Sequence, residues 1–304
     1  MTKNIAILGG TGLIGKHLTK SFEKQKLNTF VLTRGESKTI NVFTEHVHYN
    51  PYSNQWPTEE LSKCDVVINL AGKSIGDNRL TTSVKSEVYK SRVQVTKSLV
   101  TFLNNTNNKC NLLINGSAIG YYGYDRKDEM LEEDADPGIG FFAELCDAWE
   151  KEAKEFDNGR LAILRTGIVL DREEGAFKKL KTPILLSLGS ALASGKQWMP
   201  WIHINDMVGI INYIILNNSI EGVVNAVGPK PVRNKRLIGS LADSLNKAIL
   251  LPKVPGFVLK LMLGEFANSI IGGLRVMPKK LQDNNFIWEY YDIDDAMKNL
   301  NWNK

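Results

Sequence analysis

The hydrophobic positions of the chain form short, nearly continuous apolar runs that alternate with longer stretches of helical spacing. A strand buried on both faces has no polar alternate positions, so this pattern predicts a parallel sheet covered by helices on both sides. Five strands are expected, at 4–8, 28–33, 65–70, 110–115 and 161–165. Three helices are expected between strands, near 13–26, 83–104 and 140–156.

The order of these elements predicts an α/β fold, a doubly wound parallel sheet of the Rossmann type over 1–170. Beyond residue 170 the alternation of strands and helices changes, because Gly and Pro interrupt the segments 183–200 and 228–231 and the expected elements become shorter. We therefore expect a smaller C-terminal α+β lobe over 171–304 that covers the substrate side. Residues 205–227 are expected to return to the first domain and complete it.

The composition of the chain is that of an ordinary globular protein, and it excludes some classes of binding partner. Its 304 residues carry a formal net charge of +5 with acids and bases interspersed, so nucleic-acid binding is not expected. We expect no secretory signal and no membrane partner, since no apolar run is long enough to span a bilayer. The cysteines Cys64, Cys110 and Cys146 are widely spaced, which indicates reduced thiols and a cytoplasmic location.

The first apolar run leads directly into a glycine-rich turn, Gly-Gly-Thr-Gly-Leu-Ile-Gly at 9–15. Glycines at this spacing allow a tight turn, a close approach of the backbone to a pyrophosphate, and packing of the next helix on the strand. The start of that helix adds partial positive charge. The turn therefore predicts a dinucleotide site, and its candidate contacts are Gly9, Thr11, Gly12, Leu13, Ile14 and Gly15.

The end of the second strand indicates which dinucleotide binds. This strand ends in Thr33 and Arg34, with no acidic residue to bond the adenosine ribose. A guanidinium can form two parallel hydrogen bonds to a 2′-phosphate, so NADP(H) is favoured over NAD(H). The alternative is that Arg34 is only an exposed surface charge. The small residues at Leu70, Ala71 and Gly72 follow another strand and would let a ribose lie against the backbone.

Five segments carry a family resemblance. They are Gly-Gly-Thr-Gly-Leu-Ile-Gly at 9–15, Asn-Leu-Ala-Gly at 69–72, Ser-Ala-Ile-Gly-Tyr-Tyr-Gly at 117–123, Trp-Ile-His-Ile-Asn-Asp at 201–206 and Gly-Leu-Arg-Val-Met-Pro-Lys-Lys-Leu at 273–281. With them the whole chain resembles the extended short-chain dehydrogenase/reductase superfamily, specifically an atypical subgroup of the NAD-dependent epimerase/dehydratase family. The segment 250–304 resembles the C-terminal domain of unknown function that accompanies this subgroup.

The resemblance implies further cofactor contacts at Thr33, Arg34, Leu70 and Ala71, and around the rest of the pocket at Glu87, Arg92 and Arg165. Glu87 and Arg92 lie on a predicted helix, where a charged side chain facing water is the competing interpretation. The resemblance also implies an unidentified small-molecule substrate, for which a nucleotide sugar is one possibility, and a possible homodimer.

Enzymes of this family typically use a Tyr-x-x-x-Lys pair on the helix after the fifth strand, because hydride transfer requires a matching proton transfer. None of the nine tyrosines has a lysine four residues later. The matching positions are filled by Phe142 and Cys146, which can supply neither a phenol nor a cation. The usual mechanism is therefore in doubt.

Ser117 and one of two neighbouring tyrosines remain as candidate catalytic groups. Ser117 lies near the position where the family has a hydroxyl, although alignment on Tyr122 would place Ala118 there instead. Tyr121 or Tyr122 could replace the missing phenol, but neither has an evident base or cation beside it in sequence.

Several polar or aromatic residues admit a functional and a structural interpretation. His203, in an apolar run, is expected to be structural, and Asp206 is a plausible helix N-cap. The acidic run 128–136 lacks spaced His or Cys partners, so we expect a solvated loop and no metal site. Two further sets could contact a substrate or simply pack and face water: the basic Arg275, Lys279 and Lys280, and the aromatic Trp198 and Trp201.

Two functions remain open at this point. The first is an NADP-dependent epimerase/dehydratase-like oxidoreductase with an atypical active site. The second is a non-catalytic NADP(H)-binding protein that senses redox state or docks a partner.

Overall fold

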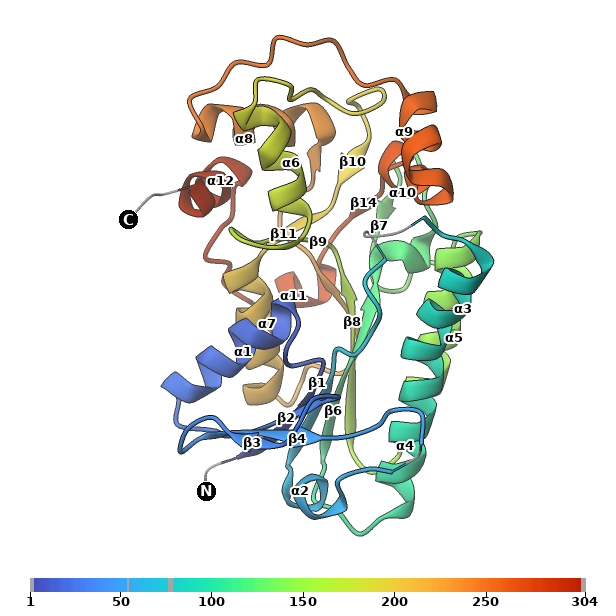
Figure 1. The fold of residues 1–304 in the computed structure, drawn as a ribbon, viewed down its shortest axis with the longest axis vertical. Helices are drawn as coiled ribbons and strands as arrows, with labels where there is room; N and C mark the ends of the chain where they lie inside the picture. Colours follow the sequence, from blue (N-terminus) through green and yellow to red (C-terminus); the bar gives the residue numbers. More distant parts are fainter. Residues whose placement is uncertain (1–2, 54, 76–78, 302–304) are drawn as a thin grey trace.

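A computed structural model describes residues 3–53, 55–75 and 79–301. It confirms the α/β fold class, with an eight-stranded and mostly parallel sheet in the order β12-β8-β6-β5-β1-β2-β4-β3 (Figure 1). The strands of this sheet are β1 (Asn4–Leu8), β2 (Asn28–Thr33), β3 (Lys38–Thr39), β4 (Thr44–His48), β5 (Val66–Asn69), β6 (Leu112–Ala118), β8 (Arg160–Thr166) and β12 (Gly222–Ala226).

Helices cover both faces of the sheet, as continuous apolar strands require. Ile5 and Ile7 of β1 pack with α1 and α7 on one face, whereas Ala6 and Leu8 pack with α2 and α4 on the other. The two helix layers lie on opposite sides in Figure 1. The helices around the sheet are α1 (Leu13–Lys24), α2 (Thr58–Lys63), α3 (Thr82–Tyr89), α4 (Val95–Asn105), α5 (Phe141–Lys154) and α7 (Ile204–Leu216).

The five expected strands and the helices near 13–26 and 140–156 are present, and two local expectations need correction. The expected single helix over 83–104 is interrupted by a π-helical turn, η1 (Lys90–Gln94), between α3 and α4. The strand β4 was not expected, because it reads Thr-Glu-His-Val-His and lacks an apolar run. It pairs in parallel with β2, near the sheet edge.

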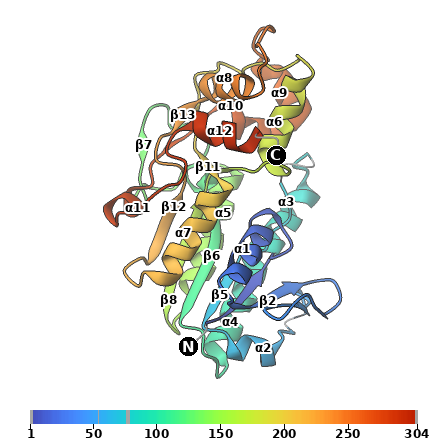
Figure 2. The ribbon, with the colours of Figure 1, turned by 90° about the vertical axis from the view of Figure 1, so that its left-hand side faces the viewer.

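The smaller C-terminal elements stack beyond the end of the sheet at which β6 and β8 terminate (Figure 2). They form two-stranded ladders covered by short helices. The elements after β6 outside the large sheet are η2 (Ile119–Tyr122), β7 (Met130–Leu131), β9 (Ile168–Leu170), α6 (Gly175–Leu185), β10 (Trp198–Met199), β11 (Trp201–His203), β13 (Val232–Arg233), α8 (Asn234–Ser244), α9 (Gly256–Leu263), η3 (Gly264–Phe266), α10 (Ala267–Ile271), β14 (Arg275–Val276), α11 (Lys279–Asp283) and α12 (Ile293–Asn301).

The chain returns to the large sheet late in the sequence, since β12 pairs in parallel with β8. The domain limits given above stay a prediction, and the last three residues of the segment 250–304 lie outside the described residues. Within the described part of the chain, no helix has the length and apolar character needed to cross a membrane.

Candidate functional site

A pocket of about 1030 Å³ lies along the ends of β1, β2 and β5. The residues that line it include nine of the cofactor contacts expected from the sequence: Gly9, Thr11, Gly12, Thr33, Arg34, Leu70, Ala71, Gly72 and Glu87. Leu13, Ile14 and Gly15 form the first turn of α1, directly after the lining residue Gly12. The structure thus brings together residues from four separate segments of the sequence.

The glycine turn has the geometry that its spacing predicts. Gly9 has a φ of +76°, and a Cβ there would lie 2.7 Å from the carbonyl oxygen of Leu70. A Cβ at Gly15 would lie 2.4 Å from the Cα of Gly10, so only glycine lets α1 pack this closely on the turn. Gly12 is the N-cap of α1, and no side chain caps the helix. Free backbone N–H groups at this helix start can therefore bind an anion.

Arg34 lies at the opposite part of the pocket, at the end of β2. Its side chain is exposed, and no carboxylate of the described residues lies within ion-pair distance of it. Tyr49 and Tyr52 line the pocket beside it. Burial raises the pKa of Tyr49 to about 12, with the nearby Arg34 acting in the opposite direction. This end of the pocket therefore presents a free guanidinium next to two tyrosine side chains.

Glu87 and Arg92 approach the pocket from α3 and the π-helical turn. The exposed Glu87 forms an ion pair with Lys73, and the hydrogen bond from that lysine lowers the pKa of Glu87. The guanidinium of Arg92 lies so close to Gly72 that a Cβ there would be 2.8 Å from its Cζ. Burial lowers the pKa of Arg92, and among the described residues its guanidinium donates to Val88 O at 3.4 Å and to a serine hydroxyl at 3.5 Å.

The weak hydrogen bonds of Arg92 leave a desolvated cation at the edge of the pocket. The guanidinium is also 5.4 Å from the ring of Trp149 on α5. π-Helical turns often occur at functional sites, because they redirect side chains that a regular helix would present elsewhere. Arg92 lies next to Gly72 but is absent from the residues that line the described pocket, so its role as a cofactor contact stays a prediction.

Arg165 is placed differently from the expectation that it contacts the cofactor. On β8, it is 2% exposed, and its Nε and Nη2 donate to Glu150 at 2.8 and 2.9 Å. Burial lowers the pKa of Arg165, but the bonds to Glu150 outweigh this effect and the net shift is upward. Its Nη1 donates to the hydroxyl of Tyr122 at 2.9 Å. The guanidinium is therefore occupied by protein groups, and Arg165 is absent from the residues that line the described pocket.

The two candidate catalytic residues both touch this buried ion pair. Ser117 is 5% exposed and its hydroxyl donates to Glu150 at 2.7 Å, so the hydroxyl is held away from a ligand. The ring of Tyr121 lies over the Arg165 guanidinium at 3.4 Å. Burial raises the pKa of this partly exposed phenol, with Arg165 opposing the shift. Tyr121 thus presents a partly exposed phenol beside Arg165, whereas the hydroxyl of Ser117 is buried and bonded to Glu150.

The face of α5 that replaces the Tyr-x-x-x-Lys pair carries Phe142, Cys146 and Glu150 at four-residue spacing. Phe142 meets the ring of Phe266 at a centroid distance of 6.1 Å. Burial raises the pKa of the Cys146 thiol to about 12, so it stays uncharged. Lys85 of α3 forms an ion pair with Glu265 next to Phe266. The C-terminal segment thus packs directly on the helix that usually carries the catalytic pair.

Sequence reasoning assigned no role to Glu150, the carboxylate that organises this site. Its position one helical turn after Cys146 was a usable signal, since a lone charge on an otherwise buried face requires a partner. Lys73 and Tyr49 were also missed as pocket residues. Lys73 directly follows the Asn-Leu-Ala-Gly segment at 69–72, whereas Tyr49 belongs to a segment without a local motif.

The structural interpretation of His203 agrees with its geometry, but the expected role of Asp206 is wrong. His203 itself is the N-cap of α7, accepting a hydrogen bond from Asn205 N at 3.1 Å. Asp206 lies inside the first helical turn, where it accepts bonds from the backbone N–H of Glu289 at 2.7 Å and of Tyr290 at 3.2 Å. It therefore ties the C-terminal segment to α7.

The acidic run is not wholly solvated, because the half-buried Glu133 accepts bonds from the backbone N–H of Asn225 at 3.1 Å and of Lys280 at 3.2 Å. Within the described ranges, no group of His, Cys, Asp and Glu could hold a metal ion. Lys279 pairs with Asp283, and Lys280 donates to a backbone carbonyl. These two lysines thus bond protein groups.

The two tryptophans take different roles. Trp201 is 1% exposed and belongs to the core of the C-terminal lobe. Trp198 lies between two guanidinium groups, with the Cζ of Arg233 3.8 Å and that of Arg275 4.9 Å from its ring. Its indole N–H donates to Asp128 at 2.8 Å.

Comparison with known proteins agrees with this architecture. The NAD dependent epimerase/dehydratase family matches residues 5–138, and a domain of unknown function (DUF1731) matches residues 254–300. The chain is 32% identical over 299 residues to epimerase family protein YfhF of Bacillus subtilis, covering 98% of this chain and 97% of the relative. It is 31% identical to the chloroplastic SDR39U1 homolog of Arabidopsis thaliana, covering 97% and 85% of the two chains.

Solved structures show the same fold. The human epimerase family protein SDR39U1, solved with NADPH, superposes with a TM-score of 0.88 at 24% identity, over 98% of this chain and 99% of that one. A nucleoside-diphosphate sugar epimerase from Corynebacterium glutamicum gives 0.79 at 28% identity, over 98% of this chain and 57% of that one. The chain therefore belongs to the epimerase family of YfhF and SDR39U1, which joins an NAD-dependent epimerase/dehydratase domain to a C-terminal DUF1731 segment.

Proposed function

We propose that this protein binds NADP(H) in the pocket along β1, β2 and β5. The observation that carries the proposal is the pairing of an uncapped start of α1 at Gly12 with a free guanidinium at Arg34 in one pocket. The pyrophosphate would lie at the helix start, and the 2′-phosphate would lie at Arg34. The NADPH in the human relative supports this choice of cofactor.

The first candidate activity is NADP-dependent oxidoreduction or epimerisation of a small molecule. Bound NADP(H) would supply or accept a hydride, which requires a proton donor or acceptor nearby. Tyr121 is the candidate proton donor, because its phenol is partly exposed and its ring is held on the Arg165 guanidinium. Ser117 and Glu150 would position Arg165 and so act on Tyr121 indirectly. A nucleotide sugar is one substrate class compatible with the family.

The second candidate is an NADP(H)-binding protein without turnover. It is favoured by one specific observation, the replacement of the usual catalytic pair by Phe142 and Cys146 together with the packing of Phe266 on Phe142. These contacts fill the position of the missing phenol with apolar rings.

Cofactor choice is tested by Arg34→Ala, with titrations of NADPH and NADH measured by calorimetry. Loss of a charged hydrogen bond costs ~1.5–3 kcal/mol, so NADPH affinity should fall about 10- to 150-fold while NADH affinity changes little. Lys20→Ala, which removes an exposed cation of α1 outside the pocket, is the matched control and should leave both affinities unchanged. Equal wild-type affinities for NADPH and NADH would refute the assignment.

The two activities are separated by a metabolite screen that follows both NADPH absorbance and product formation. Tyr121→Phe keeps the ring on Arg165 and removes only the hydroxyl, so turnover should fall at least about tenfold with unchanged NADPH affinity. A screen in which no compound is converted, despite tight NADPH binding, would favour the protein without turnover.

A further inference from the structure

Two segments of the C-terminal lobe concentrate positive charge. Residues 175–205 contain four lysines and residues 244–264 contain three, and neither segment contains Asp or Glu. These seven charges exceed the net charge of +5 of the whole chain. These two segments are therefore strongly basic, whereas the rest of the chain outside them is slightly acidic.

The same two segments expose large apolar side chains. Leu186 and Leu188, just after α6, are 65% and 61% exposed, Leu250 is 77% exposed, and Phe257 at the start of α9 is 73% exposed. We call these four residues the distal patch. Scattered exposed leucines are ordinary, but a cluster of this kind marks an interaction surface.

Hydrogen bonds bring the two segments together at the distal end of the lobe. The hydroxyl of Ser190 donates to Pro252 O at 2.6 Å, and Ala193 N donates to Val254 O at 2.8 Å. The ammonium of Lys253 donates to the carbonyl of Ser194 at 2.8 Å. In Figure 1 the loop from α8 to α9 crosses this end of the molecule, above the loop that leaves α6.

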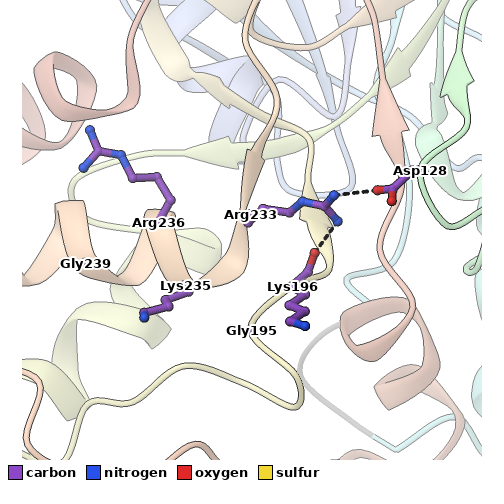
Figure 3. A pocket seen from close by; sticks show the side chains of 7 residues that line it. All are labelled: Asp128, Gly195, Lys196, Arg233, Lys235, Arg236 and Gly239. Atoms are coloured by element: carbon purple, nitrogen blue, oxygen red, sulfur yellow. Dashed lines mark hydrogen bonds and ion pairs between the residues drawn. The ribbon is translucent and has the colours of Figure 1, made fainter.

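A basic hollow of about 740 Å³ adjoins this end (Figure 3). Its lining includes Lys196, Arg233, Lys235 and Arg236, with Asp128 as the acidic member. Arg233 pairs with Asp128 at 2.5 Å, and Arg236 pairs with a carboxylate of α12. Lys196 and Lys235 are exposed, and none of the described carboxylates lies within ion-pair distance of them. Two ammonium groups are thus free to meet external anions.

The hollow and the distal patch form one continuous surface. A Cβ at Gly195 would lie 3.4 Å from the Cβ of Lys235 and 3.7 Å from the Cε of Lys253. Lys235 N also donates to Gly195 O at 2.9 Å. The cations of the hollow therefore flank the loop that carries Leu250.

We propose that this end of the lobe docks on an anionic phospholipid surface. Leu186, Leu188, Leu250 and Phe257 enter the boundary between headgroups and acyl chains, and Lys196 and Lys235 meet lipid phosphates. Apolar side chains that protrude from a lysine-rich face are typical of proteins that bind at the membrane interface. Such binding needs no membrane-spanning helix.

A second copy of the chain fits this surface less well. A two-fold symmetric interface would bring Lys196 and Lys235 of one copy close to those of the other, where like charges repel. An acidic protein would satisfy the lysines. However, three of the four patch side chains protrude from loops and the fourth from the start of α9, and a lipid surface receives such side chains without a shaped partner.

The test is flotation of the full chain, loaded with NADPH, with phosphatidylcholine vesicles that do or do not contain about a third phosphatidylserine. Wild type should float only with the anionic vesicles, and less so at higher salt. Leu250→Ser combined with Phe257→Ser should reduce the bound fraction at least about fivefold, as should Lys196→Ala combined with Lys235→Ala. Matched controls are Val42→Ser with Ile287→Ser, at 90% and 86% exposed sites, and Lys24→Ala with Lys154→Ala.

Unchanged NADPH affinity confirms that each variant is folded. Absence of wild-type flotation at low salt overturns the proposal, as does a loss of binding that the control variants share. Displacement by inorganic phosphate at an ionic strength where chloride has no effect would instead assign a soluble phosphate site to the hollow. If light scattering shows a wild-type dimer that Phe257→Ser dissociates, the patch belongs to an interface with a second copy. If the chain binds polyglutamate and neither Leu250→Ser nor Phe257→Ser changes that binding, the surface is assigned to an acidic protein.

Discussion

Replacement of Glu150 by alanine should unfold the protein more readily than any surface substitution on the same helix. The carboxylate is fully buried and accepts hydrogen bonds from Ser117 at 2.7 Å and from Arg165 at 2.8 and 2.9 Å. Glu150→Ala leaves a guanidinium that is 2% exposed without its counter-charge. Breaking one side of a buried ion pair costs about 3–5 kcal/mol, which predicts a Tm lower by roughly 6–20 °C.

The assay is urea unfolding followed by circular dichroism, with thermal melts in parallel. Glu152→Ala on the same helix is the control, because Glu152 pairs with Lys97 at 3.5 Å near the surface and should lose less than about 1 kcal/mol. Glu150→Ala combined with Arg165→Met removes both charges and should recover part of the loss. A loss below about 1 kcal/mol for Glu150→Ala would show that water or a moved side chain compensates Arg165, and would refute the argument.

Two further predictions concern stability. Gly15→Ala places a Cβ 2.4 Å from the Cα of Gly10, so it should lower the free energy of unfolding by about 1–3 kcal/mol and also weaken NADPH binding. Gly239→Ala, at a site with open space around it, should instead stabilise α8 by about 0.5–1 kcal/mol. Urea unfolding compares the two variants, and equal effects would contradict the packing argument. Burial raises the pKa of Asp206 from 3.8 to about 6, so the folded state retains a proton that the unfolded state has released, and stability falls as the pH rises from about 4 to 6. Asp206→Asn should remove about 2–3 kcal/mol of that pH dependence in unfolding measurements at pH 4 and 7, and an unchanged slope would contradict the linkage.

The sequence predicted the fold correctly where a local pattern of apolar residues or glycines was strong. The buried positions of β1, β2 and β5 are mostly apolar, and close packing explains why the turn after β1 requires glycines. By contrast, β4 is held by its pairing with β2, since its own pattern is mostly polar. The π-helical turn at Lys90–Gln94 also has no local marker, because the apolar spacing continues through it.

The candidate site was predictable in part for the same reason. Arg34 and the glycines belong to motifs, so their place in one pocket follows from parallel strands ending at a common edge. Arg165 could not be placed in this way, because the orientation of its guanidinium depends on Glu150 from a different element. Its charge alone was compatible with a ligand or with a buried partner.

The packing of Phe266 on Phe142, next to the Lys85–Glu265 pair, has a consequence for protein engineering. The C-terminal segment 254–300 supplies one half of each contact, and helices far earlier in the chain supply the other half. A chimera that exchanges this segment between relatives should fold well only when the facing residues of α3 and α5 are exchanged with it. The two regions thus form a matched pair that recombination would have to transfer together.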